Sequence, residues 1–162
     1  DQLNCLKESE GDLEFMEFNV NTCFEQDGLK KEAERIVRDA ETCIKAGKTA
    51  VIYTSRKLLA PENLSKEEVL KISVDISDAV TSIIGKLTVK PGFIVAKGGI
   101  TSSDVGTKAL HVKKALVMGQ VKKGIPVWMT GPESKFPGMP YIIFPGNVGE
   151  TDTLKEIVEE LL

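Results

Sequence analysis

The segment Phe93–Asp104, with the sequence FIVAKGGITSSD, decides the fold of this chain. An apolar run ends in the pair Gly98-Gly99, and hydroxyl and acidic residues then open a helix-like stretch. This order predicts a strand, a tight glycine loop and a helix N-terminus. Glycines let the backbone approach a ligand closely, and a helix start offers unpaired N–H groups and the positive end of its dipole. The segment fits a phosphate-binding turn or, alternatively, a turn whose glycines only allow tight packing.

Helix and strand patterns alternate on both sides of this segment. The expected strands are residues 13–18, 49–54, 93–96, 112–118, 125–129 and 139–144. The expected helices are residues 1–9, 27–46, 65–87, 101–110 and a last amphipathic stretch after Asp152. Ser65 and Glu68 form a capping box at the start of the third helix, and Thr101 with Asp104 resembles a second one.

Strands separated by helices predict an α/β fold, a three-layer domain with a mostly parallel central sheet and helices on both faces. The closely spaced strands near the C-terminal end add antiparallel or mixed pairs at one side. No repeat or linker interrupts residues 1–162, so we expect a single domain. The chain starts at Asp1 without an initiator Met, inside a helix-like stretch, which indicates a piece of a longer polypeptide.

The composition excludes several classes of function. With 162 residues, 41% of them hydrophobic, the chain can bury a sizeable core. A net charge of −3 does not suit a nucleic-acid-binding surface. No apolar run approaches the roughly 20 residues of a transmembrane helix, and no signal peptide is visible. Three cysteines without a CxxC pair and a single histidine do not fit the ligand pattern of a zinc site, and they predict free thiols in a reducing cytoplasm.

Three loops with glycines follow predicted strands and are candidates for a binding site. They cover residues 98–101, 131–138 and 145–149, and together they can line one crevice, although each alone is ordinary turn chemistry. The stretch 53–57 also ends a strand, at the edge where open α/β sheets bind ligands. A solvated loop is the equal alternative there. His111 is interpreted as a surface or helix-end residue rather than a base.

Four stretches together carry a family resemblance. They are VIYTSR at 51–56, AKGGITSSD at 96–104, GPESKFPG at 131–138 and FPGNVG at 144–149. With these stretches the chain resembles the C-terminal nucleotide-binding domain of the four-carbon acid sugar kinase family over nearly its whole length. The resemblance implies ATP with Mg²⁺ as cofactors and a 3-oxo-tetronate, threonate or erythronate as substrate. It also implies that the sugar acid is held mainly by a separate N-terminal domain.

The same resemblance implies which residues bind the nucleotide. They lie in two of the glycine loops and are Gly98, Gly99, Ile100, Thr101, Ser134, Lys135 and Gly138. Lys97, Lys135 or Lys108 would neutralise phosphate charge. Many family members carry an acidic residue at the position of Ile100, so no metal ligand is predicted, and no catalytic residue is assigned.

Phosphoryl transfer depends mainly on positioning and charge neutralisation. We therefore expect the ATP-binding half of a cytoplasmic kinase for a four-carbon sugar acid, inactive as an isolated piece, with a homodimer as one option for its assembly. The alternative is a non-catalytic α/β module that binds a nucleotide or another anion, or that serves oligomerisation.

Overall fold

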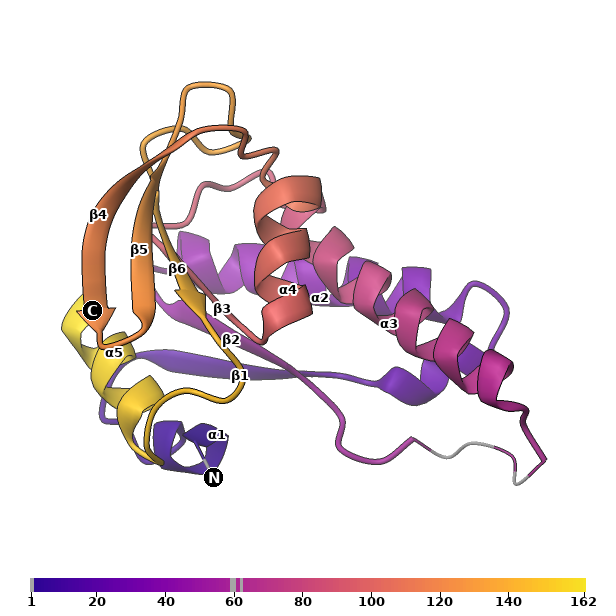
Figure 1. The fold of residues 1–162 in the computed structure, drawn as a ribbon. Coiled ribbons are helices and arrows are strands. Elements are labelled where there is room, and N and C mark those ends of the chain that lie inside the picture. The colour runs from indigo at the N-terminus through magenta and orange to yellow at the C-terminus, as the bar shows by residue number, and fades with distance from the viewer. Residues whose placement is uncertain (1, 59–60, 62) are drawn as a thin grey trace. The chain divides into compact units, whose positions relative to one another are not determined.

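The chain divides into two compact units. The computed structural model describes residues 2–58, 61 and 63–162. One unit consists of the residues up to Asp12 together with Lys90–Leu162, and the other is Leu13–Val89. Figure 1 follows the chain through both units.

The unit Leu13–Val89 is built on a parallel pair of strands. β1 (Leu13–Phe18) pairs with β2 (Thr49–Thr54) along their whole lengths. The connection between them contains the short 3-10 helix η1 (Val20–Phe24) and the helix α2 (Gly28–Lys45). α2 contacts both strands and also the long helix α3 (Lys66–Lys86) that follows β2. The buried side chains of α2 include Ala33, Ile36, Ala40 and Cys43. Because these residues recur at helical spacing, they form one face of the helix, which covers the sheet.

Polar contacts anchor both long helices of this unit. At α3 the Ser65 hydroxyl accepts the Glu68 N–H (3.2 Å), and the Glu68 carboxylate accepts the Ser65 N–H (2.8 Å). The predicted capping box is therefore confirmed. On α2 the buried carboxylate of Glu32 accepts the Asn19 N–H (2.8 Å) and the Arg35 guanidinium (2.7 Å), and it thereby ties the end of β1 to the helix.

The other unit contains a four-stranded mixed sheet. Its strands are β3 (Ile94–Lys97), β4 (Ala115–Lys122), β5 (Ile125–Thr130) and β6 (Pro140–Phe144), in the order β3-β6-β5-β4. β3 and β6 are parallel, whereas β5 is antiparallel to both of its neighbours. The carboxyl ends of β3 and β6 therefore lie together at one end of the strands, which we call the β3–β6 edge. The carboxyl end of β5 lies at the other end of the strands, which we call the opposite edge.

Helices cover both faces of this sheet. α4 (Gly99–Asp104) continues into a π-helical turn, η2 (Val105–Ala109), and contacts β3 and β6. The buried Tyr141 hydroxyl donates to the Ser102 carbonyl oxygen of α4. The next residue, Ile142, packs in a core cluster with Ile157 of α5 (Thr153–Leu161). Because neighbouring strand residues point to opposite faces, α4 and α5 lie on opposite sides. α5 also contacts α1 (Gln2–Leu6).

The prediction of one mostly parallel central sheet is wrong, because the described strands form two separate sheets. Local patterns located the other described strands to within one residue, whereas the strand expected at 112–118 is β4 at Ala115–Lys122. Strand pairing, in contrast, depends on contacts between distant segments. The tight turn Lys123-Gly124, with Gly124 at φ +79°, and the loop 131–139 reverse the chain twice. The predicted antiparallel pairs near the C-terminal end are confirmed, and so are helices on both faces within this unit.

Two further expectations concern the whole chain. Cys5, Cys23 and Cys43 are free thiols, as predicted. Among the helices of residues 2–58, 61 and 63–162, none is long and apolar enough to cross a membrane.

Candidate functional site

Two of the three glycine loops meet at the edge where β3 and β6 end. Lys97 and Phe144, the last residues of these strands, stand side by side in the register. The Gly98 N–H donates to the Phe144 carbonyl oxygen (2.8 Å). A Cβ placed on Gly146 would lie 3.7 Å from the Gly98 Cα. The loops 98–101 and 145–149 therefore lie against each other at the backbone level.

The turn into α4 depends on the conformation of its first glycine. Gly98 has φ +114°, a region that residues with a Cβ rarely adopt. It is the N-cap of α4, which begins at Gly99. The predicted start at Thr101 and Asp104 is wrong: Asp104 instead pairs with Lys108 (2.9 Å). Gly99 has open space on its Cβ side, with nothing within 4 Å.

The side chain of Ser102 holds this turn in place. Its buried Oγ lies 2.6 Å from the Gly98 carbonyl oxygen and 2.8 Å from that of Ala96, so its one proton is shared between them. The Ser102 N–H also donates to the Gly98 carbonyl oxygen (2.9 Å). Sequence reasoning missed this role. The available signal was a serine four residues after Gly98, because a helical serine often bonds back to the carbonyl at i−4.

The first turn of α4 supplies hydrogen-bond donors at this edge. Gly99, Ile100 and Thr101 occupy the first three helical positions, where N–H groups have no acceptor within the helix. The Ile100 side chain is 73% exposed, and Thr101 is half-buried. The helical segment runs on through η2, so the donors share the positive end of a continuous dipole. Such donors can accept an anionic ligand.

The third glycine loop, residues 131–138, lies elsewhere. It follows β5, whose carboxyl end is at the opposite edge of the sheet. The buried Ser134 hydroxyl donates to the Leu110 carbonyl oxygen (2.9 Å), and the Lys135 N–H donates to the same oxygen (2.9 Å). Leu110 ends the helical segment that begins at Gly99, roughly 15 Å away at 1.5 Å per residue. The structure therefore does not bring this loop to residues 98–101.

Other groups in the loop 131–138 are also engaged within the unit. The Glu133 carboxylate accepts the N–H groups of Lys113 (2.8 Å) and Lys114 (2.7 Å), and these bonds lower its pKa. The exposed Gly138 has φ +64°, and its N–H donates to the Thr130 carbonyl oxygen (3.0 Å). His111, just after Leu110, is exposed with φ +55°, so the interpretation as a surface residue at a helix end is confirmed.

The stretch 53–57 is tied to its own unit. The Ser55 hydroxyl accepts the Val20 N–H (3.0 Å), and the Ser55 N–H donates to the Phe18 carbonyl oxygen (2.9 Å). The Asn21 amide donates to the Lys57 carbonyl oxygen (3.0 Å). These bonds hold the end of β2 against η1, and they give Ser55 a structural role.

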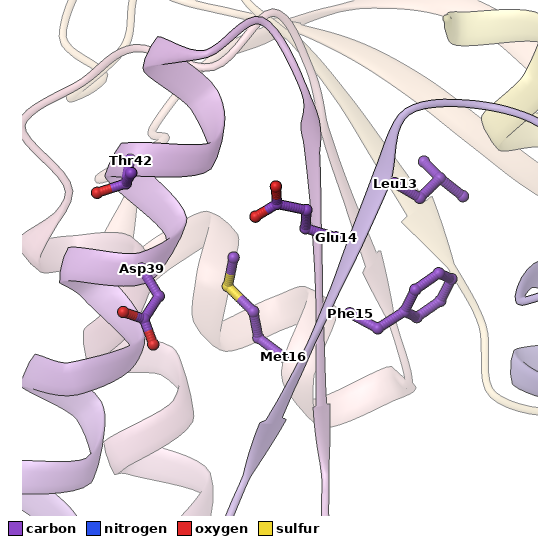
Figure 2. A pocket seen from close by; sticks show the side chains of 6 residues that line it. All are labelled: Leu13, Glu14, Phe15, Met16, Asp39 and Thr42. Atoms are coloured by element: carbon purple, nitrogen blue, oxygen red, sulfur yellow. The ribbon is translucent and has the colours of Figure 1, made fainter.

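The unit Leu13–Val89 has a hollow of about 550 Å³ beside β1. Figure 2 shows Glu14 and Met16 on the side of β1 that faces α2, and Leu13 and Phe15 on the other side. The carboxylate of Glu14 pairs with Lys48 (2.7 Å), and this hydrogen bond lowers its pKa. Asp39, also in the lining, pairs with Arg35 (3.1 Å). Both acids therefore already have cationic partners, and the hollow contains none of the predicted site residues.

The Cys43 thiol lies near this hollow and is buried. Burial and the nearby Glu14 carboxylate raise its pKa, which disfavours a reactive thiolate. Within the described part of the chain, no three His, Cys, Asp or Glu side chains gather closely enough to hold a metal ion.

The fold and the β3–β6 edge together define a class, an α/β domain in which a glycine turn joins a parallel strand to a helix, as in many phosphate-binding sites. The sequence match is more specific than this class. Residues 1–154 match the family described as nucleotide-binding C-terminal domain, and the chain belongs to that family. No curated protein matches the chain.

Two solved structures share the fold. One is a domain of unknown function from Bordetella bronchiseptica, solved as a domain-swapped dimer with bound citrate. It is 15% identical, with a TM-score of 0.64, covering 99% of this chain and 37% of that one. The second, a Haemophilus influenzae protein of the same domain family, is 16% identical, with a TM-score of 0.60 and coverage of 99% and 38%. The chain thus spans less than two fifths of the length of either protein.

Proposed function

We propose that this chain is the ATP-binding part of a kinase that phosphorylates a four-carbon sugar acid of the 3-oxo-tetronate, threonate or erythronate class. Membership of the nucleotide-binding C-terminal domain family supports the nucleotide. The resemblance of four stretches to the acid sugar kinases supports the acceptor. The main support for the location of the site is the close approach of the Gly98 and Gly146 loops at the carboxyl ends of β3 and β6.

In this proposal the phosphates of ATP lie at that edge. Their oxygens accept the N–H groups of Gly99, Ile100 and Thr101, and the Thr101 hydroxyl is a further donor. Mg²⁺ is bound mainly by the phosphates themselves, as is usual for nucleotide sites, which suits an edge where no acidic cluster is available among the described residues. When bound, the metal neutralises charge on the transferring phosphoryl group.

The loop with Ser134, Lys135 and Gly138 is proposed to line a more distant part of the nucleotide. Because Ser134 and Lys135 bond to Leu110, they lie at the far end of the helical segment that starts at the phosphates. A nucleotide that touches both loops must extend along this segment. Because the Ser134 hydroxyl already donates to the Leu110 carbonyl oxygen, this loop would contact the nucleotide through its backbone and through Lys135.

The acceptor acid is proposed to bind mainly on another domain. Transfer requires the attacking oxygen to lie about 3–3.5 Å from the phosphorus, in line with the leaving oxygen. The residues that this chain places at the β3–β6 edge are donors to phosphate, and none is assigned as a base. Relatives more than twice as long as this chain provide room for an acceptor domain.

Two assays on the complete protein test the proposal. Calorimetric titration with Mg-ATP should show binding, and ADP should form when threonate, erythronate or a 3-oxo-tetronate is added. Saturable ATP binding without turnover of any four-carbon acid would favour the alternative, a non-catalytic module. No ATP binding at all would rule out both the kinase and a nucleotide-binding module.

We also propose that the chain assembles with a second copy through β4. The relative from Bordetella bronchiseptica forms a domain-swapped dimer. β4 is an edge strand, and it exposes Leu116 by 66%, Val117 by 65% and Met118 by 54%. A long apolar edge is a template for strand pairing. Leu116→Lys should therefore shift the sedimentation coefficient from dimer to monomer, whereas Leu70→Lys, equally exposed on α3, should not.

A further inference from the structure

Lys97 has a position that none of the other candidate lysines shares. It is the last residue of β3, directly before Gly98, and its register partner is Phe144 at the end of β6. Its Nζ lies 4.0 Å from the centre of the Phe144 ring. Phe144 is fully buried in the core cluster with Ile142 and Ile157, so the ring gives this ammonium a rigid support.

The Lys97 side chain is partly buried beside the Phe144 ring. Among the described residues, no carboxylate forms an ion pair with it, and partial burial lowers its pKa. The attraction between the ammonium and the face of the Phe144 ring is favourable, but it compensates for only part of the hydration that the ammonium loses on burial. An anion next to this ammonium would gain more than it would beside a fully hydrated lysine, because the lower local dielectric strengthens the attraction.

The two other candidate lysines, Lys108 and Lys135, lie in different surroundings. Lys108 is paired with Asp104 (2.9 Å) on the same helical segment. The Lys135 Nζ lies 5.4 Å from the Phe136 ring, in the loop at the opposite edge of the sheet. Of these three lysines, Lys97 alone directly precedes Gly98, and its ammonium lies over the Phe144 ring, on the face of the sheet that α5 covers.

We infer that the Lys97 ammonium binds the phosphate chain of the nucleotide, with Phe144 supporting it when no ligand is present. This inference rests on the function proposed above and deepens it, because it assigns the phosphate-charge contact to one side chain. The recognised chemistry is a polyphosphate, whether it belongs to a nucleotide or is free. Affinity should then depend on Lys97 for ATP and ADP and not for adenosine.

Substitutions on the complete protein test this assignment by calorimetry. Lys97→Met keeps the chain length and a favourable sulfur–aromatic contact, so the fold should survive, as a thermal melt would show. Losing a charge-assisted hydrogen bond should weaken ATP and ADP by about 10- to 100-fold, with adenosine unchanged. Lys97→Arg should keep most of the affinity. Lys123→Met, in the exposed β4–β5 turn, is the matched control and should behave like the wild type.

The outcomes separate the two claims. If wild-type protein binds Mg-ATP and Lys97→Met binds it equally well, this inference fails and the proposed function stands. If wild-type protein does not bind Mg-ATP, the proposed function itself fails. Equal losses for ATP and adenosine would show that Lys97 shapes the whole site instead of binding phosphate. Tripolyphosphate distinguishes a nucleotide from a free polyphosphate as the ligand. If tripolyphosphate competes with ATP in the wild type but not in Lys97→Met, the phosphate chain alone is recognised.

Discussion

The main-chain N–H of Gly98 donates a 2.8 Å hydrogen bond to the carbonyl oxygen of Phe144, the last residue of the neighbouring strand. This bond continues the β3–β6 ladder one residue beyond β3. The glycine turn is therefore positioned by the sheet as well as by its own sequence. A turn held in this way is organised before a ligand arrives, which reduces the entropic cost of binding.

Replacing Gly99 by valine should weaken nucleotide binding without unfolding the protein. Gly99 has no atom within 4 Å on its Cβ side, so a side chain fits, and the free energy of unfolding should change by less than about 1 kcal/mol. The branched side chain would, however, stand where phosphate must approach the backbone, so Mg-ATP should bind at least about 10-fold more weakly. Calorimetry and thermal melts on the same preparation measure both effects.

Gly98→Val is the matched comparison for this prediction. At φ +114° a valine is strained, so this variant should lose about 1–3 kcal/mol of stability. If Gly99→Val binds Mg-ATP as tightly as the wild type, the turn does not belong to the site. If Gly99→Val unfolds as readily as Gly98→Val, the turn serves packing alone.

Two neighbouring serines provide a second test of the turn. Ser102→Ala removes the buried hydroxyl shared by the Gly98 and Ala96 carbonyls, which leaves them without that partner. The free energy of unfolding should fall by about 1–3 kcal/mol, and Mg-ATP should bind more weakly because the turn loosens. Ser103→Ala, on the exposed side of α4, should change stability by less than about 0.5 kcal/mol. Equal stabilities of the two variants, measured by urea unfolding, would contradict the role assigned to Ser102.

The strands and helices of this chain could be predicted because their signals are local. Ser65 and Glu68 form the predicted capping box since both partners lie within one turn of the same helix. The run 49–54 forms β2 because it is continuous and β-prone. α4 begins earlier than the cap-like pair Thr101 and Asp104 predicts, because the φ of Gly98 decides the boundary.

The pairing of strands could not be predicted, because it depends on contacts between distant residues. Nothing local to β1 and β2 indicates that they form a sheet separate from β3. The same difficulty applies to the site. The loops 98–101 and 145–149 meet because β3 and β6 are parallel neighbours, and the loop 131–138 lies at the other edge because β5 runs in the opposite direction.

Acid should destabilise the unit Leu13–Val89 through Glu32. Its side chain is 10% exposed, and hydrogen bonds from Arg35 and from the Asn19 N–H hold its pKa below the ordinary 4.5. A carboxyl whose pKa is depressed by folding stabilises the protein above its unfolded-state pKa, and this contribution is lost as the pH falls through the folded-state pKa. Stability should therefore fall below about pH 4.5.

Glu32→Gln measures the size of that contribution. At pH 7 the variant should be less stable by about 1.5–3 kcal/mol, the range for hydrogen bonds to a charged group. The difference from the wild type should shrink as the pH falls, since a protonated Glu32 resembles glutamine. Glu34→Gln is the control on the same helix, because the half-exposed Glu34 carboxylate lies 4.0 Å from the Lys86 ammonium and should matter little. Urea unfolding across this pH range would contradict the assignment if the difference for Glu32→Gln stayed constant.

The last prediction concerns the 162-residue chain on its own. If the acceptor acid is held by another domain, this chain has only the donors for phosphate at the β3–β6 edge, and it cannot align an acceptor oxygen with the phosphorus. It should bind Mg-ATP weakly and form no ADP with threonate, erythronate or 3-oxo-tetronates, while the complete protein should phosphorylate at least one of them. Parallel assays of ADP release with the same panel of acids compare the two. Full turnover by the isolated chain would place the acceptor site within these residues and overturn the proposed division of labour. Adding the separately produced remainder of the protein should restore turnover if the two parts can reassemble, because transfer depends on alignment and not on covalent connection.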